Sequence, residues 1–296
     1  MPHLHHVALE SSRSVCLTLI LAVMALVYVR GWLSVSSSGI GRISVWCVVS
    51  FLGGVFLIWA AMASPLAALD HELLTVHMAQ HLLLMTIAPP LIWLAAPVDP
   101  ILRGLPRRLV ESLVPLWQSQ TAKRLATSLG GRKFAWFAAC AALVGWHIPK
   151  VFMLGMQSAP WHLFEHLSFL ATGLLFWQPV VQPAAGASRQ DFSMILYLFF
   201  ATLPCDILSG FLVFSDRVVY PIYFSSSHLL GFSPLVDQQC AAALMWTCVT
   251  VVYFVAGAII TTRILSPQPL PNAAQLRSIR PETGIGHSVS RGLEAL

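Results

Sequence analysis

The sequence of 296 residues has few charged residues, and this shortage excludes a soluble globular protein. Only 10% of the residues are Asp, Glu, Lys or Arg, whereas 57% are hydrophobic and the mean hydropathy is +0.74. A soluble domain carries about 25% charged residues, so this chain cannot cover a water-facing surface. Because the apolar residues come in blocks of about 20, the length that crosses a bilayer as a helix, the sequence predicts an integral membrane protein.

Clustered cysteines are also missing, which argues against a thiolate metal site. The six cysteines are scattered through apolar blocks without a CxxC pair, as is typical of small packing residues. The net charge of +5 would suggest nucleic acid as the partner of a soluble chain. Here the basic residues sort by side of the membrane instead, so we expect membrane lipid and no nucleic acid as a partner.

The apolar blocks predict an all-α fold, a polytopic bundle of about seven transmembrane helices. The predicted spans are 15–33, 44–63, 73–97, 132–149, 161–181, 191–214 and 238–262. The bundle (15–262) follows an extracytoplasmic segment (1–14), contains a basic cytoplasmic loop (98–131) and precedes a polar tail (263–296). We expect the tail to be disordered, because it is polar and rich in proline at its start.

The positions of Lys and Arg predict an N-terminus outside and a C-terminus in the cytoplasm. With the basic loop inside, fourteen of the seventeen basic residues lie on the cytoplasmic side of this topology. Leucines alternate with the charges of the loop, so we expect it to lie on the anionic inner leaflet.

Histidines gather near the predicted outer ends of the helices. His77 and His81 are four residues apart, as are His162 and His166, and this spacing places each pair on one helix face. Each pair can bind one metal ion, or the two pairs can close one site between helices. Asp206 is predicted at a similar depth in the sixth span, where an ionisable side chain is costly and marks a candidate functional site.

These positions predict a metal site just below the outer surface. Its predicted ligands are His77, His81, His162, His166, His147 and Asp206. Groups expected to support the ligands are Gln80, Glu165, Asp237 and Gln238. The predicted entry path for copper contains thioethers, which suit Cu(I), from Met78, Met153 and Met156.

Short motifs occur in order between residues 70 and 246. They are HMAQH (77–81), APP (88–90), WHIP (146–149), HxxxH (162–166), WxP (177–179), YPxY (220–223), DQQ (237–239) and MW (245–246). In this order they resemble the polytopic CtaG family of cytochrome c oxidase assembly factors, which is linked to caa-type oxidases. Alanine occupies 241–243, where glycine is usual in the family.

The resemblance implies a non-enzymatic assembly factor that crosses a bacterial plasma membrane several times. It also implies copper as the bound metal, with oxidase subunits and a copper chaperone as partners. Haem and zinc stay open, because imidazole binds several metals and can ligate haem iron axially.

Other functions use the same histidines. A haem-binding or electron-transfer protein is the main alternative. A zinc peptidase would use the H-x-x-E-H pattern of residues 162–166, with Glu165 as general base. A di-iron oxidoreductase would need an HxxHH box, which the chain lacks. Finally, the histidines can simply pack and form hydrogen bonds in a scaffold that holds oxidase subunits.

Overall fold

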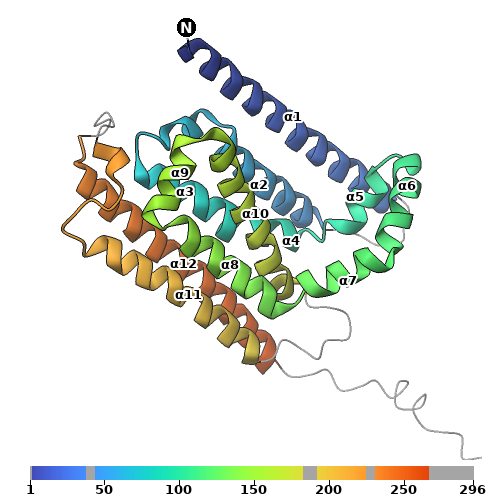
Figure 1. Ribbon diagram of the computed structural model, residues 1–296. Coiled ribbons are helices and arrows are strands. Elements are labelled where there is room, and N and C mark those ends of the chain that lie inside the picture. The colour runs from blue at the N-terminus through green and yellow to red at the C-terminus, as the bar shows by residue number, and fades with distance from the viewer. Residues whose placement is uncertain (1, 38–43, 183–191, 225–230, 267–296) are drawn as a thin grey trace, which may run out of the picture.

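The computed structural model describes residues 2–37, 44–182, 192–224 and 231–266, and most of them are helical (Figure 1). No strand occurs in these ranges. Helices suit a bilayer because they pair every interior backbone N–H and C=O within one segment. The predicted all-α fold is confirmed.

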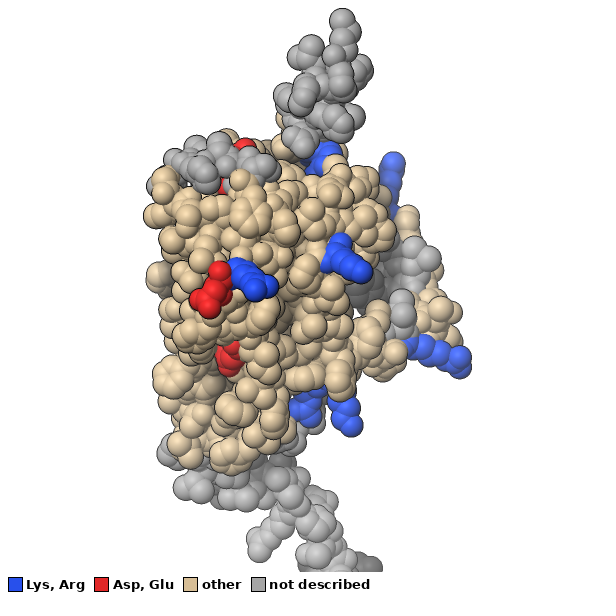
Figure 2. All heavy atoms as spheres, turned by 60° about the vertical axis from the view of Figure 1, so that its left-hand side comes forward, with Lys and Arg blue, Asp and Glu red and all other residues tan. Residues whose placement is uncertain are grey.

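Four helices are long and apolar enough to cross a membrane. They are α1 (Pro2–Ser37), α2 (Val45–Met62), α11 (Phe192–Val213) and α12 (Pro234–Leu265). Two bent pairs of helices meet the same criteria together, so the described residues contain four to six candidate spans. Figure 2 shows one face of the molecule, on which charged side chains are sparse.

The first bent pair contains most of the third predicted span. Its long arm is a continuous helix made of α3 (Leu74–Leu82), a π turn η2 (Leu83–Ile87) and α4 (Ala88–Leu94). The π turn directly precedes two prolines in α4, whose missing N–H groups interrupt the regular hydrogen-bond pattern. After α4 the chain bends by 72° into α5 (Val98–Gly104).

The second bent pair is α8 (Arg132–Trp146) and α9 (Pro149–Gln157), whose axes differ by 79°. It is followed by α10 (Ala159–Val181), which has 23 residues but is not among the candidate spans. Two histidines and a glutamate in its first half lower its hydropathy. The count of seven spans and the orientation of the bundle stay predictions.

Three segments differ from their predicted form. Helix α1 begins at Pro2, so residues 2–14 are helical, and their extracytoplasmic location stays a prediction. The basic loop is largely helical, because it forms α5, α6 (Arg107–Gln118) and α7 (Gln120–Leu129). Helix α12 continues to Leu265, and the predicted disorder of the remaining tail concerns 267–296, outside the described residues.

The packing of the helices places α3 and α10 inside the bundle. Helices α11 and α12 run side by side along one edge, and α1 lies along the opposite edge (Figure 1). Between these edges, α12 packs on α3, and α10 packs on α4, α8 and α9. The two helices that carry the histidine pairs are therefore surrounded by other helices.

Candidate metal centre

The two histidine pairs meet where α3 faces α10. Within each helix the two ring centroids are 4.3 Å apart. Between the helices, the rings of His77 and His162 are 5.6 Å apart and those of His81 and His166 are 5.8 Å apart. All four side chains are buried. The structure thus brings together the four histidines that the sequence predicted to share a site.

The carboxylate of Glu165 lies beside the two histidines of α3. Its Oε1 is 3.3 Å from Nε2 of His81 and 3.6 Å from Nε2 of His77. One potential ligand atom from each of these three residues lies within 4.8 Å of the others. The sequence suggested Glu165 as a support behind the histidines, whereas the structure groups its carboxylate with the ring nitrogens of His77 and His81. We call His77, His81 and Glu165 the inner triad.

Helix α9 forms a wall of the inner triad and needs a glycine there. A Cβ atom on Gly155 would lie 2.8 Å from Oε2 of Glu165, closer than van der Waals contact. Phe152 on the same helix packs against His77, with ring centroids 5.0 Å apart. Gly155 therefore provides the space that the carboxylate occupies.

Most donor atoms of this cluster are buried without a hydrogen-bond partner among the described residues. These atoms are both ring nitrogens of His77 and His81, both carboxylate oxygens of Glu165, and Nε2 of His162 and of His166. Buried polar atoms are normally paired, because an unpaired one costs about 1–3 kcal/mol in lost hydration. Imidazole nitrogen and carboxylate oxygen both bind transition metals, so a metal ion would satisfy several of these atoms together.

A second group of donors lies beside the first. Asp70 follows η1 (Pro65–Leu69), and its Oδ2 is 3.4 Å from Nε2 of His162. Its Oδ1 is 3.7 Å from Nε2 of His71. Burial raises the pKa of the Asp70 carboxyl above its ordinary value, and the adjacent His71 partly offsets this rise. We call Asp70, His71 and His162 the outer triad.

The outer triad was not predicted from the sequence. Asp70 and His71 lie in a turn before α3, whereas His162 is on α10, so no helical spacing connects them. The signal that was available is the Asp-His pair directly before a helix that carries two further histidines.

His147 approaches the cluster from the end of α8. Its Nδ1 is 2.7 Å from the carbonyl oxygen of Leu143, and because a carbonyl only accepts, we assign the proton to Nδ1. Nε2 is then unprotonated and lies 3.2 Å from the thioether sulfur of Met78. Neither atom has a proton to donate to the other, so the contact is not a hydrogen bond. The His147 ring is 5.8 Å from that of His81.

Asp237 and Gln238 hold backbone groups around the site. Asp237 accepts hydrogen bonds from the N–H groups of Leu74 and Thr75, at 2.6 Å and 3.1 Å, and so caps the first turn of α3. The side-chain oxygen of Gln238 accepts a hydrogen bond from the Val219 N–H at 2.7 Å. Both side chains therefore bind backbone groups rather than an imidazole N–H.

Two buried tyrosines in η3 and just before it, which the sequence marked only as part of a motif, also hold the site. The Tyr220 hydroxyl donates to the carbonyl oxygen of His147 at 3.0 Å. The Tyr223 hydroxyl, in η3 (Pro221–Phe224), donates to the carbonyl oxygen of Asp70 at 2.8 Å. The YPxY motif thus fixes one residue of each flank of the histidine cluster.

Four other predicted residues are not members of either triad, although the Gln80 side chain lies beside the Asp70 carboxyl and partly offsets the rise in its pKa. Asp206 is on α11, which packs mainly on α12 and α8, and it belongs to neither triad. Gln80 donates from its side chain to the carbonyl of Ala67 at 3.2 Å. On α9, Met156 is buried in the hydrophobic core and Met153 is half-buried. Among the predicted thioethers, that of Met78 contacts the ring of His147.

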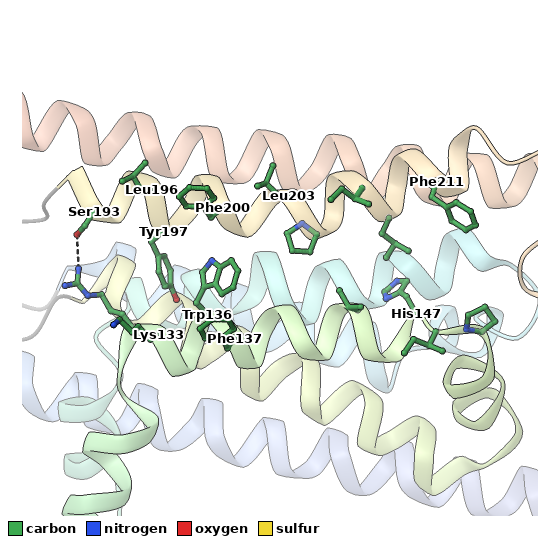
Figure 3. A pocket seen from close by; sticks show the side chains of 17 residues that line it. Lys133, Trp136, Phe137, His147, Ser193, Leu196, Tyr197, Phe200, Leu203 and Phe211 are labelled. Carbon is green, nitrogen blue, oxygen red and sulfur yellow. Dashed lines mark hydrogen bonds between the residues drawn. The ribbon is translucent and has the colours of Figure 1, made fainter.

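The spaces around His147 differ greatly in size. A groove of about 1240 Å³ runs between α8 and α11, with Lys133 near one end and His147 near the other (Figure 3). Its walls are almost entirely apolar. Inside the bundle, the cavity beside His81 and His147 is only about 30 Å³. Pockets for organic ligands measure roughly 300–1,000 Å³, so the interior cavity is smaller than this range and the groove is larger.

The chain matches a known protein family over most of its length. Residues 26–267 match the family described as the cytochrome c oxidase caa3 assembly factor, Caa3_CtaG. The chain belongs to this family. The match includes both triads, His147 and the two tyrosines, so the resemblance inferred from the sequence motifs is confirmed.

Relatives of this chain occur in mycobacteria. The chain is 25% identical over 238 residues to an uncharacterized protein of Mycobacterium bovis and to one of Mycobacterium tuberculosis. A Mycobacterium leprae protein is 24% identical over 247 residues. Each alignment covers 76% of this chain but only 35% of the relative, so the chain spans about a third of their length. No solved structure matches the chain.

Proposed function

We propose that this assembly factor binds a copper ion between α3 and α10 and delivers it to cytochrome c oxidase subunits. The observation that carries the proposal is the inner triad, in which two imidazoles and a carboxylate converge in a buried place. Their donor atoms have no hydrogen-bond partner in the described part of the chain. A purely structural cluster of this polarity would be expected to pair its own atoms.

The donors next to the inner triad favour copper over other metals. Two nitrogens and one oxygen suit Cu, Zn, Fe and Ni alike. The thioether of Met78, beside the unprotonated nitrogen of His147, adds a soft donor that suits Cu(I). Copper is also a metal that the oxidase itself requires, which links the site to the task of the family.

The proposed site serves the outer side of a bacterial plasma membrane. This placement follows from the predicted orientation, in which the basic loop is cytoplasmic. Oxidase subunits are the proposed recipients, and a copper chaperone is the proposed source. The role is delivery of an ion, so we propose no catalytic residue.

Metal analysis of the purified protein tests the site. We expect wild-type protein to hold copper that resists removal by a chelator, and the double variant His77→Ala/His81→Ala to lose this slowly exchanging ion. Glu165→Gln keeps the shape of the side chain but removes its charge, and it is expected to weaken copper binding at least tenfold. The matched control is Glu111→Gln, which changes an exposed carboxylate on α6 that pairs with Arg107. Wild-type protein without metal, or equal metal in all four proteins, would contradict the ligand assignment.

A deletion strain tests delivery. Without the protein, the oxidase subunits should be made but should lack copper, and the defect should be largest in low-copper medium. A gene with Glu111→Gln should restore oxidase activity, whereas one with Glu165→Gln should not. Full restoration by Glu165→Gln would show that the protein acts only as a scaffold for the oxidase.

A further inference from the structure

We propose that the outer triad is a second copper site, which receives the ion from water and passes it to the inner triad. The inference rests on the proposed function, because it describes how the buried site is loaded. The inference assigns a ligand role to Asp70 and His71, neither of which is among the ligands predicted from the sequence.

The exposure of the two triads sets the direction of transfer. The side chain of His71 is 47% exposed, whereas those of Asp70 and His162 are 5% and 11% exposed. In the inner triad every side chain is at most 6% exposed. An ion that arrives from water therefore meets His71 first.

The outer triad has the donors of a metal site. Two imidazoles flank one carboxylate, with 3.4 Å and 3.7 Å between the nearest nitrogen and oxygen atoms. Oδ1 of Asp70 and Nε2 of His162 are buried and have no hydrogen-bond partner within the described ranges. Tyr223 fixes the backbone of Asp70 through its carbonyl oxygen, which holds the carboxylate in place. One ligand atom from each member lies within 4.8 Å of the others.

His162 connects the two triads. Its Nε2 faces Asp70, while its ring stacks on that of His77 with centroids 5.6 Å apart. The ring of His166 is 4.3 Å from that of His162 and 5.8 Å from that of His81. Neighbouring imidazole rings thus connect the exposed outer triad with the buried inner triad.

Transfer along this path is an exchange of ligands. The ion leaves Asp70 and His71 while still held by His162, and it forms new bonds to His77 and then to Glu165. Each metal–ligand bond that breaks is replaced by another. The charge of the ion does not change, so the step requires no oxidant or reductant.

Stoichiometry and loading rate together test the proposal on the full chain in detergent. We expect wild-type protein to bind two copper ions, one of which a chelator removes quickly. His71→Ala should bind one ion that the chelator removes slowly, and its loading after mixing with copper should be at least tenfold slower than in wild type. Asp70→Asn, which preserves shape, should behave in the same way. His77→Ala/His81→Ala should bind one ion that exchanges quickly.

The control is Asp216→Asn, which changes an exposed carboxylate between α11 and η3 and should match wild type in both measurements. If His71→Ala and Asp70→Asn load as fast as wild type and wild type binds one ion, the outer site is refuted while the inner site stands. If wild type binds one ion and only His71→Ala and Asp70→Asn lose it, the outer site stands and the inner assignment fails. No bound copper in wild type would refute both.

Discussion

Gly155 offers a way to move one proposed ligand without touching any ligand residue. In Gly155→Ala the new Cβ would lie 2.8 Å from Oε2 of Glu165, whereas ordinary contact begins at 3.4 Å. The carboxylate must therefore shift by at least about 0.6 Å, which is three times the tolerance of about 0.2 Å in metal–ligand distances. The contact is with the flexible end of a side chain, so the backbone of α9 does not need to move.

The expected result is a loss of copper affinity in a protein that still folds. Disturbing the position of a metal ligand typically lowers affinity 10- to 100-fold, which is about 1.4–2.8 kcal/mol. The matched control is Gly145→Ala on α8, because a Cβ at this position meets nothing within 4 Å. Gly145→Ala should bind copper as wild type does and should unfold at the same or a slightly higher temperature, since alanine favours helix more than glycine.

Competition with a chelator of known copper affinity measures the effect in detergent solution, and circular dichroism monitors helix content. Both variants should retain the helix content of wild type. If Gly155→Ala and Gly145→Ala bind copper within threefold of each other, Glu165 does not ligate the ion at this position and the inner triad is wrongly assigned.

Three further changes examine the fold around the site. Gly31→Ala places a Cβ against the backbone of α5 and should destabilise the protein by about 1–3 kcal/mol in thermal unfolding. The control is Gly53→Ala, whose Cβ meets nothing within 4 Å and should not destabilise the protein. Equal melting temperatures of the two variants would show that α1 and α5 do not approach closely. Asp237→Asn weakens the cap of α3 and should cost about 1 kcal/mol, and unchanged stability would contradict the capping role. Thiol labelling of intact cells tests the orientation in a protein without native cysteines. An impermeant reagent should label Asp216→Cys and not Ser119→Cys. The reverse pattern would contradict the predicted topology.

The composition of the chain was enough to predict the fold class and much of the position of its helices. Apolar blocks of spanning length leave few structures other than a helical bundle. The ends of helices were less predictable. α1 begins at Pro2, well before the apolar block, because a helix can continue beyond the bilayer where residues are polar. The bends after α4 and α8 depend on prolines and packing, which hydropathy averages over.

Helical spacing predicted the histidine pairs but not the residues that complete the site. The i, i+4 rule fixes which side chains share a face of one helix, and it correctly grouped the pairs of α3 and of α10. Asp206 was included because of its depth, yet depth does not determine which helices are neighbours, and α11 packs mainly on α12 and α8. Asp70 and His71 were not grouped with His162, because a turn rather than a helix presents them.

X-ray absorption at the copper edge tests the central claim most directly. The sample is the His71→Ala variant loaded with one equivalent of copper, so that the inner triad is the intended site. We predict the scattering pattern of two imidazoles and one further oxygen ligand at about 2.0–2.2 Å, with the oxygen contribution lost or lengthened in the added variant Glu165→Gln. A spectrum without imidazole scattering, or one that Glu165→Gln leaves unchanged, would contradict the account.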